Sequence, residues 1–356
     1  MDWIESLVLG LVQGLTEFLP ISSDGHLSVT QKVFNHLTGK SRGTAEEIFF
    51  DVMLHVGTLV AIVLHYRADA VDGARGLLGS DAVPPPYRRP SVVRVGILAF
   101  LATLPLIPDK LFFVPLIEKA FESLTWTGVG FLITAAILLM TIRLQGGSKG
   151  AAETSWLDAL LVGIAQMFAP LPGVSRSGLT ISAALALGFS RTWAVNFSLL
   201  IAVPAILGAT VFELRHVDPK VLTGERIGQI VASAAVAGVV GYLAIVWLVR
   251  IVRSGRVWYF SVYLVLLGIG LIAWDSTKGV RTDAGPAHAA DRPLRRGPAG
   301  PGDRPLPGRI AGTLARPLAP GPRPGDPAPG PAVEFDRAAG GLVLGTGLGS
   351  GRVRPR

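Results

Sequence analysis

Residues that could carry out chemistry gather near the start of the chain, between Gln13 and His26, in the stretch QGLTEFLPISSDGH. Apolar residues recur there at helical spacing, and Gln13 and Glu17, four apart, fall on one helix face. Pro20 breaks the helix, and the Ser-Ser-Asp-Gly run offers capping residues for a new one. A carboxylate therefore ends one helix, while hydroxyls, free N–H groups and a histidine begin the next. Such a helix start favours an anion, above all a phosphate.

The same pattern returns about 150 residues later, from Gly163 to Gly178, in the stretch GIAQMFAPLPGVSRSG. The sequence therefore contains two copies of one pattern: a helix, a proline break, a capping serine and a second helix. The second copy has Arg176 where the first has Ser23, and a guanidinium fork suits phosphate oxygens. In one ungapped register the matched pairs are Gly10 with Gly163, Gln13 with Gln166, Ser22 with Ser175, and Gly25 with Gly178.

The composition indicates that these residues lie in a membrane. Hydrophobic residues make up 50% of the chain and charged residues only 16%, and the mean hydropathy is +0.49. These values are typical of a polytopic membrane protein. The chain has no cysteine, which excludes disulfides, thiolate metal sites and a cysteine nucleophile.

The elements that position the two motifs are expected to be membrane helices. Six stretches approach the ~20 apolar residues that the hydrocarbon core requires. The two broken units, the second of which covers 157–190, are too short and too polar to cross as straight helices, so we expect two re-entrant helix pairs. One pair and three spans form repeat one, about 1–142, and the same set forms repeat two, about 157–275. The spans are expected at about 48–65, 92–108, 125–142, 194–213, 228–250 and 258–274.

Three spans in each half is an odd number, so the two repeats must have opposite orientations. Inverted repeats with broken helices near the midplane are a known arrangement for holding anions. The sequence therefore predicts an all-α polytopic membrane protein with an inverted repeat of six transmembrane helices and two re-entrant pairs. The arginine-rich loop 66–91 and the run from Arg250 to Arg256 fall on one side, which the positive-inside rule makes cytoplasmic. The site then opens to the outer face.

The tail 276–356 differs from the body. It is rich in Pro, Gly, Arg and Ala without periodicity, so it is expected to be disordered, and we assign it no function. Thirteen Lys and Arg against six Asp and Glu lie there, so the tail carries nearly all of the net charge of +8. The body has no basic stripe with interleaved aromatic residues, and no nucleic-acid partner is expected.

Ionisable residues at membrane depth are functional candidates, because burying them is costly. Each also has a structural interpretation. Glu17 could form only a buried ion pair with Arg176, and Thr180, one turn beyond Arg176, could bond to its own helix instead of a ligand. Asp51 and His55, four apart in the first span, could bridge helices or belong to the site. The sequence leaves these alternatives open.

The stretches 13–26 and 172–178 closely resemble the two signature motifs of the bacterial undecaprenyl-diphosphate phosphatases, the family tied to bacitracin resistance. The likeness covers roughly residues 1–275. It implies hydrolysis of undecaprenyl diphosphate to undecaprenyl phosphate and inorganic phosphate. This reaction recycles the lipid carrier for peptidoglycan synthesis in the bacterial plasma membrane. Membrane lipids and a second copy of the chain, in a homodimer, are the other partners that we expect.

The resemblance also assigns site residues. The family's motif has two acidic positions, of which Glu17 fills the second and Gln13 the first, and Asp24 departs from the commoner Ser or Thr. A carboxylate at that position should repel a diphosphate unless a divalent cation or Arg176 intervenes. A divalent cation, Mg²⁺ or Ca²⁺, is implied by the resemblance, with Glu17 as a candidate ligand. The implied catalytic residues are Glu17, Ser23, His26 and Arg176, and the implied substrate-binding residues are Gln13, Ser22, Ser175, Ser177 and Thr180.

Several mechanisms and functions fit these residues. Ser23 could attack the terminal phosphorus while His26, about one turn away, takes its proton. Alternatively, His26 could be the nucleophile or could activate a water molecule. The alternative function is a transporter or flippase for a phosphorylated lipid, because inverted repeats suit alternating access. A weaker alternative is a membrane scaffold whose basic tail binds anionic lipid.

Overall fold

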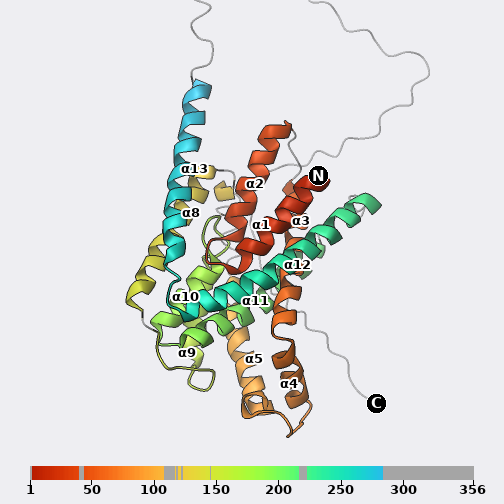
Figure 1. Ribbon diagram of the computed structural model, residues 1–356, viewed down its shortest axis with the longest axis vertical. Coiled ribbons are helices and arrows are strands. Elements are labelled where there is room, and N and C mark those ends of the chain that lie inside the picture. The colour runs from red at the N-terminus through yellow and green to blue at the C-terminus, as the bar shows by residue number, and fades with distance from the viewer. Residues whose placement is uncertain are drawn as a thin grey trace, which may run out of the picture. The chain divides into compact units, whose positions relative to one another are not determined.

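The computed structural model describes residues 2–39, 44–107, 117, 119–121, 123–144, 146–215 and 223–283. The regular elements in these ranges are helices, so the all-α prediction is confirmed (Figure 1). An isolated bridge joins Lys149 to Phe189. The helices are α1 (Trp3–Phe18), α2 (Ser23–Thr38), α3 (Thr44–His65), α4 (Arg67–Leu77), α5 (Arg89–Thr103), α8 (Leu124–Met140), α9 (Trp156–Gln166), α10 (Arg176–Ala186), α11 (Arg191–Leu214), α12 (Gly224–Arg253) and α13 (Tyr259–Asp283), with short 3₁₀ turns at Pro85–Tyr87 and Thr141–Arg143.

Four helices of the described part are long and apolar enough to cross a membrane. They cover 124–143, 191–212, 224–253 and 259–277. A fifth span is formed if α3 and α4, which meet at a bend of 75°, are counted together. The protein is therefore a multi-pass membrane protein. The span predicted at 92–108, the second in chain order, corresponds to α5, which has only 15 residues. Pro105 lies two residues beyond its end at Thr103, and a proline has no N–H with which to continue the helical hydrogen bonds.

Two other boundaries differ from the sequence prediction. The loop expected at 66–91 contains α4 and a 3₁₀ turn. The last span continues to Asp283, beyond its expected end at 274 and into the segment expected to be tail. Residues 284–356 of the predicted tail, and much of the link between α5 and α8, lie outside the described residues.

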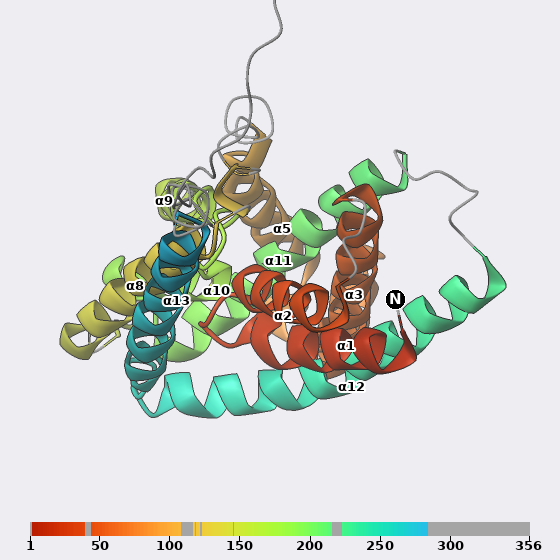
Figure 2. The same cartoon turned by 90° about the horizontal axis from the view of Figure 1, so that it is seen from above.

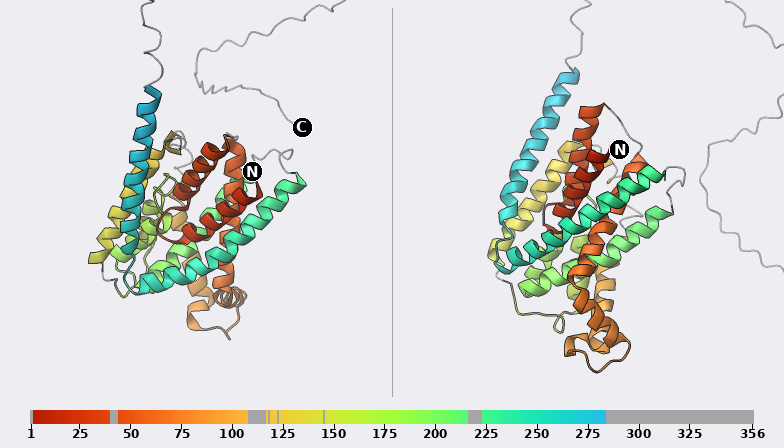
Figure 3. Two further views of the ribbon diagram at one scale, coloured as in Figure 1. Left: turned by 45° about the horizontal axis from the view of Figure 1, so that its top comes forward. Right: turned by 45° about the vertical axis from the view of Figure 1, so that its right-hand side comes forward.

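Both broken units fold as two helices, and each first helix packs on the other half of the chain. Helix α1 lies along α12, as Figures 2 and 3 show, and α9 lies along α5. The matched glycines make this possible. A Cβ atom on Gly10 would lie 2.5 Å from the carbonyl oxygen of Ser233, and one on Gly163 would lie 2.4 Å from that of Ala102. Only glycine allows the backbones to approach so closely.

The proline breaks of the two helix units lie against each other. The Ser177 hydroxyl donates a hydrogen bond to the carbonyl oxygen of Leu19, at 3.1 Å. A Cβ atom on Gly25 would lie 2.9 Å from the backbone of Gly173, which has a φ of +85°. The Thr134 hydroxyl, on α8, also fixes the second break by donating to the Gly173 carbonyl oxygen at 2.9 Å. The starts of α2 and α10 are thereby held beside each other.

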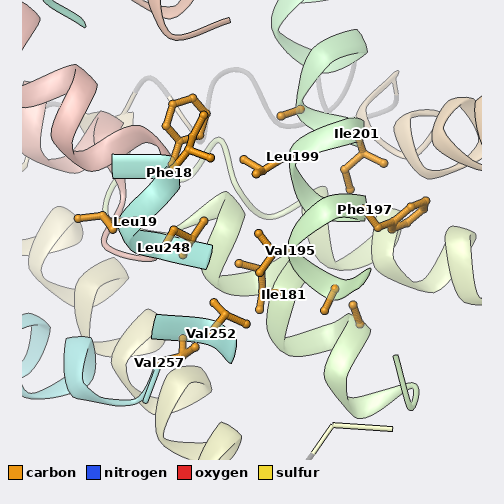
Figure 4. Close-up of a cluster of buried hydrophobic side chains, with 14 of the residues drawn as sticks. Phe18, Leu19, Ile181, Val195, Phe197, Leu199, Ile201, Leu248, Val252 and Val257 are labelled. Carbon is orange, nitrogen blue, oxygen red and sulfur yellow. The ribbon is translucent and has the colours of Figure 1, made fainter. Parts of the chain in front are cut away.

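Apolar side chains surround this meeting point (Figure 4). Phe18 and Leu19, at the end of the first helix, are buried with residues of the second half of the chain. Figure 4 shows Phe197 and Leu199 of α11 and Leu248 of α12 in the same cluster. The core therefore joins the two repeats and fixes where their broken ends lie.

Candidate active site

The two helix starts have the same capping hydrogen bond, as the sequence register predicted. The Ser22 hydroxyl accepts a hydrogen bond from the N–H of Gly25 at 3.3 Å. The Ser175 hydroxyl accepts one from the N–H of Gly178 at 3.1 Å. The first N–H groups of α2 and α10 have no acceptor within their own helix, so both starts can bind an anion. Ser22 has a φ of 69°, the only positive value at a non-glycine residue in the described ranges, and such strain is typical of functional sites.

Glu17 joins the two motifs. Its Oε1 accepts a hydrogen bond from the Arg176 guanidinium at 2.7 Å. Its Oε2 accepts one from the Ser23 hydroxyl at 2.7 Å and one from the Gln13 amide at 3.0 Å. The carboxylate is buried, with 6% of the residue exposed. The structure thus brings together Gln13, Glu17, Ser23 and Arg176, as expected from the sequence.

Arg176 retains a donor that the protein does not use. Its Nη2 binds Glu17, whereas its Nη1 has no hydrogen-bond partner among the described residues. The side chain is 16% exposed and lines a cavity. Phosphate oxygens that enter this cavity would meet the positive charge of the guanidinium.

The cavity has a volume of about 600 Å³ and two chemically different parts. Glu17, Ser23, Asp24 and Arg176 line its polar part. The remaining walls are mostly apolar and come from α3, α5, the second break and α11; they include Val52, Leu106, Ile107, Pro170, Val174, Ile206 and Phe212. This arrangement fits an amphipathic ligand with a phosphate group at one end and a hydrocarbon chain at the other.

His26 does not accept a hydrogen bond from the Ser23 hydroxyl, which donates to Glu17 instead. Its Nδ1 lies 2.7 Å from the Ser22 carbonyl oxygen, and its Nε2 lies 2.7 Å from the Tyr263 hydroxyl. The ring also stacks on Tyr263, and it is absent from the described residues that line the cavity. Because a carbonyl only accepts, Nδ1 carries the hydrogen and Nε2 accepts from Tyr263. The acceptor of the Ser23 proton is therefore Glu17 in this structure, and a catalytic role for His26 stays a prediction.

Asp51 and His55, whose roles the sequence left open, have different roles in the structure. Asp51 accepts from the Gln31 amide at 2.9 and 3.1 Å, which bridges α3 to α2. His55 instead lines the cavity, with its Nε2 3.4 Å from Glu17 Oε2 and 3.6 Å from Asp24 Oδ1. The spacing of four residues places both on one face of α3, but only the fold shows which of them reaches the site.

The remaining candidate residues form hydrogen bonds that hold the two helix starts of the site in place. The Thr180 hydroxyl donates to the Arg176 carbonyl oxygen at 2.9 Å and lies 2.6 Å from the Ser198 hydroxyl of α11. The Ser177 hydroxyl donates a hydrogen bond to the Leu19 carbonyl oxygen and lies 3.2 Å from the Ser175 hydroxyl. Ser175 and Ser22 cap their helices and also line the cavity. Direct contact of these residues with a substrate stays a prediction.

The described side chains do not fit a divalent cation at Glu17. Both of its oxygens already accept hydrogen bonds, and a guanidinium lies 2.7 Å away, where a second cation would be repelled. The described residues also contain no group of three His, Cys, Asp or Glu side chains that could hold a metal ion. We therefore derive no step through a cation.

The fold and the site together define a class of protein: a multi-pass membrane protein with a cavity, polar at one end and apolar along its walls, where two broken helix units meet. A family model described as bacitracin resistance protein BacA matches residues 6–270. The chain belongs to this family.

Curated relatives match over nearly their whole length. The undecaprenyl-diphosphatase of Carboxydothermus hydrogenoformans is 37% identical over 275 residues, which cover 76% of this chain and 97% of that protein. The undecaprenyl-diphosphatase of Desulfatibacillum aliphaticivorans is 35% identical over 276 residues, or 75% of this chain and 97% of the relative. The undecaprenyl-diphosphatase of a Nocardioides species is 35% identical over 280 residues, or 78% and 98%.

Proposed function

We propose that this protein hydrolyses undecaprenyl diphosphate to undecaprenyl phosphate and inorganic phosphate. The observation that carries the proposal is the hydrogen-bonded chain from Ser23 through Glu17 to Arg176, at the polar end of a cavity with apolar walls. The named activity of the relatives supports it. The reaction recycles the lipid carrier of peptidoglycan synthesis and accounts for the bacitracin resistance for which the family is named.

The geometry supports Ser23 as the nucleophile. Its hydroxyl already donates to Glu17 Oε2 at 2.7 Å, so the carboxylate is placed to take the proton as the oxygen attacks phosphorus. Arg176 and the N–H groups at the starts of α2 and α10 neutralise the charge on the phosphoryl oxygens. The bond to the bridging oxygen breaks, and undecaprenyl phosphate leaves. A phosphoserine remains, and water hydrolyses it in a second step.

We also propose the finer membrane arrangement that the sequence predicted: six spans and two re-entrant pairs in an inverted repeat. The reciprocal packing supports it, because α1 contacts α12 of the second half and α9 contacts α5 of the first. In this arrangement the protein lies in the bacterial plasma membrane and the site opens to the outer face. Membrane lipids cover the exposed apolar side chains of the helices. A homodimer, and a cation that enters with the diphosphate, are predictions for the same assembly.

Phosphate release by the purified protein tests the activity directly. We expect the full-length protein in detergent to release inorganic phosphate from undecaprenyl diphosphate. Ser23→Ala should lower turnover by more than about 10³, because a nucleophile contributes more than a hydrogen-bond donor. Ser182→Ala is a matched control: this serine also lies in a buried helix, but its hydroxyl has no partner among the described residues. Membrane transport of the lipid without phosphate release would favour a flippase instead.

Mapping the trapped phosphate distinguishes the nucleophiles. Early quenching followed by mass spectrometry should find phosphate on Ser23. An adduct on His26 would make the histidine the nucleophile, and the absence of both adducts would indicate direct attack by water. Acid must be avoided during the quench, because phosphohistidine is acid-labile.

A further inference from the structure

The imidazole of His55 lies between two carboxylates that line the cavity. Its Nε2 is 3.4 Å from Glu17 Oε2 and 3.6 Å from Asp24 Oδ1. Its Nδ1 is 2.8 Å from the carbonyl oxygen of Asp51 on its own helix. The ring is partly exposed, with 21% of the side chain accessible, and Asp24 is 37% exposed. Both groups can therefore meet a ligand in the cavity.

Hydrogen-bond accounting fixes the protons on this ring. The Asp51 carbonyl can only accept, so Nδ1 must carry a hydrogen. If Nε2 had only a lone pair, it would face two carboxylates with no hydrogen between them, which is repulsive. A hydrogen on Nε2 as well makes the ring an imidazolium, and its positive charge then faces both carboxylates.

The charges at the site then balance. The charged groups that face the ring are Glu17 from α1 and Asp24 from α2, and the Arg176 guanidinium of α10 lies on the other oxygen of Glu17. Asp51, on α3 itself, is bound by Gln31. The site therefore contains two negative charges, on the carboxylates, and two positive charges, on the guanidinium and the imidazolium. Of these two cations only the imidazolium can release a proton near neutral pH.

We propose that His55 is a further catalytic residue, the group that donates and then recovers a proton during diphosphate hydrolysis, with Asp24 as its positioning residue. The inference rests on the proposed function. It also explains why Asp24 does not simply repel the substrate, because the imidazolium of His55 faces its carboxylate.

The two half-reactions balance with these groups alone. In the first, Ser23 Oγ bonds to phosphorus and its proton passes to Glu17. The bond from phosphorus to the bridging oxygen breaks, and that oxygen takes the Nε2 proton of His55. In the second, a water oxygen bonds to phosphorus and one water proton passes to the now free Nε2. The bond from phosphorus to Ser23 Oγ breaks, and Oγ recovers its proton from Glu17.

The second half-reaction depends more strongly on His55. A phosphate monoester leaves readily without a proton, whereas water is a weak nucleophile until a base takes its proton. Loss of the imidazole should therefore slow hydrolysis of the phosphoserine more than its formation. Phosphate should accumulate on Ser23 in a variant without His55, which a purely structural role would not cause.

Chemical rescue tests the proposal. We expect His55→Ala to lower kcat by about 10²–10⁴, and added imidazole to restore at least tenfold, because the vacated space adjoins the cavity. His65→Ala is the matched control: it removes a histidine of the same helix that packs against Tyr66 and Tyr242, and it should change kcat less than twofold. A folded His55→Ala protein within tenfold of the parent, or one that imidazole does not rescue, would overturn the proposal.

A second variant covers the case in which His55→Ala does not fold. His55→Gln retains a donor for the Asp51 carbonyl oxygen but cannot transfer a proton. It should carry phosphate on Ser23 at steady state, and its kcat should lose a limb of the pH profile that the parent shows. If the phosphoserine does not accumulate, or if the profile keeps both limbs, the proposal is wrong. If the parent releases no phosphate at all, the proposed function fails instead.

Discussion

Replacing Glu17 by Gln keeps the size of the side chain but removes the charge that Ser23 and Arg176 share. The amide oxygen can still accept from Arg176, but the amide nitrogen then faces two donors, the Gln13 amide and the Ser23 hydroxyl. The Ser23 hydroxyl loses the base that takes its proton. Since general bases contribute about 10²–10⁴ in rate, we expect kcat for phosphate release to fall by that factor.

The same change should also lower stability. Removing one partner from a buried ion pair costs about 3–5 kcal/mol. Arg176 retains one neutral hydrogen bond, worth about 1 kcal/mol, so we expect a loss of about 2–4 kcal/mol. Thermal unfolding in detergent, read beside steady-state kinetics, separates the two effects: addition of substrate should raise the unfolding temperature of the variant without restoring turnover.

Gln13→Ala is the matched comparison, because Gln13 donates to the same oxygen of Glu17 without contributing charge. It should affect KM more than kcat, by about tenfold to a hundredfold, in line with the loss of one hydrogen bond to a charged group. Equal damage from the two variants would refute the assignment of Glu17 as the base. A Glu17→Gln enzyme within tenfold of the parent would do the same.

Three further predictions concern the rest of the chain. Arg176→Lys should lower kcat/KM at least tenfold although the charge remains, because an ammonium cannot bind Glu17 and phosphate oxygens in one planar fork. Kinetics close to those of the parent would exclude simultaneous binding of Glu17 and phosphate by Arg176. Gly173→Ala should prevent folding of the second break, since the new Cβ would lie 2.2 Å from the Thr127 carbonyl oxygen at a φ of +85°, and size-exclusion chromatography of the variant checks this. Deletion of residues 284–356 should leave phosphate release unchanged, because the family match ends at residue 270; a large loss would give the tail a role.

Local rules predict the capped helix starts well. The caps at Ser22 and Ser175 depend on a residue three positions later, so their pattern is visible in the sequence. The ion pair of Glu17 with Arg176 is also expected, because few other partners exist for two charges at membrane depth. The internal repeat adds that both residues lie at the broken ends of matching helix units.

Contacts between distant segments could not be predicted in this way. His26 turns to Tyr263, which is 237 residues away, and nothing near either residue indicates the pairing. A tyrosine within an apolar span is the only signal. The prediction of six spans is confirmed only in part for a related reason: hydropathy reports apolar length, but where α5 ends depends on a nearby proline and on what packs there. The role of His55 required knowledge of which face of α3 meets the first break.

The packing of α1 on α12 has a consequence for how the protein is made. The glycine face of α1 (Trp3–Phe18) has its partner in Gly224–Arg253, which the ribosome completes after most of the chain has emerged. At the usual rates of synthesis this delay is about 10–45 s. During that time α1 can pack only on α2 and α3, which it also contacts in the folded protein, and its glycine face has no partner. The active site is therefore completed only when the second half of the chain packs against the first.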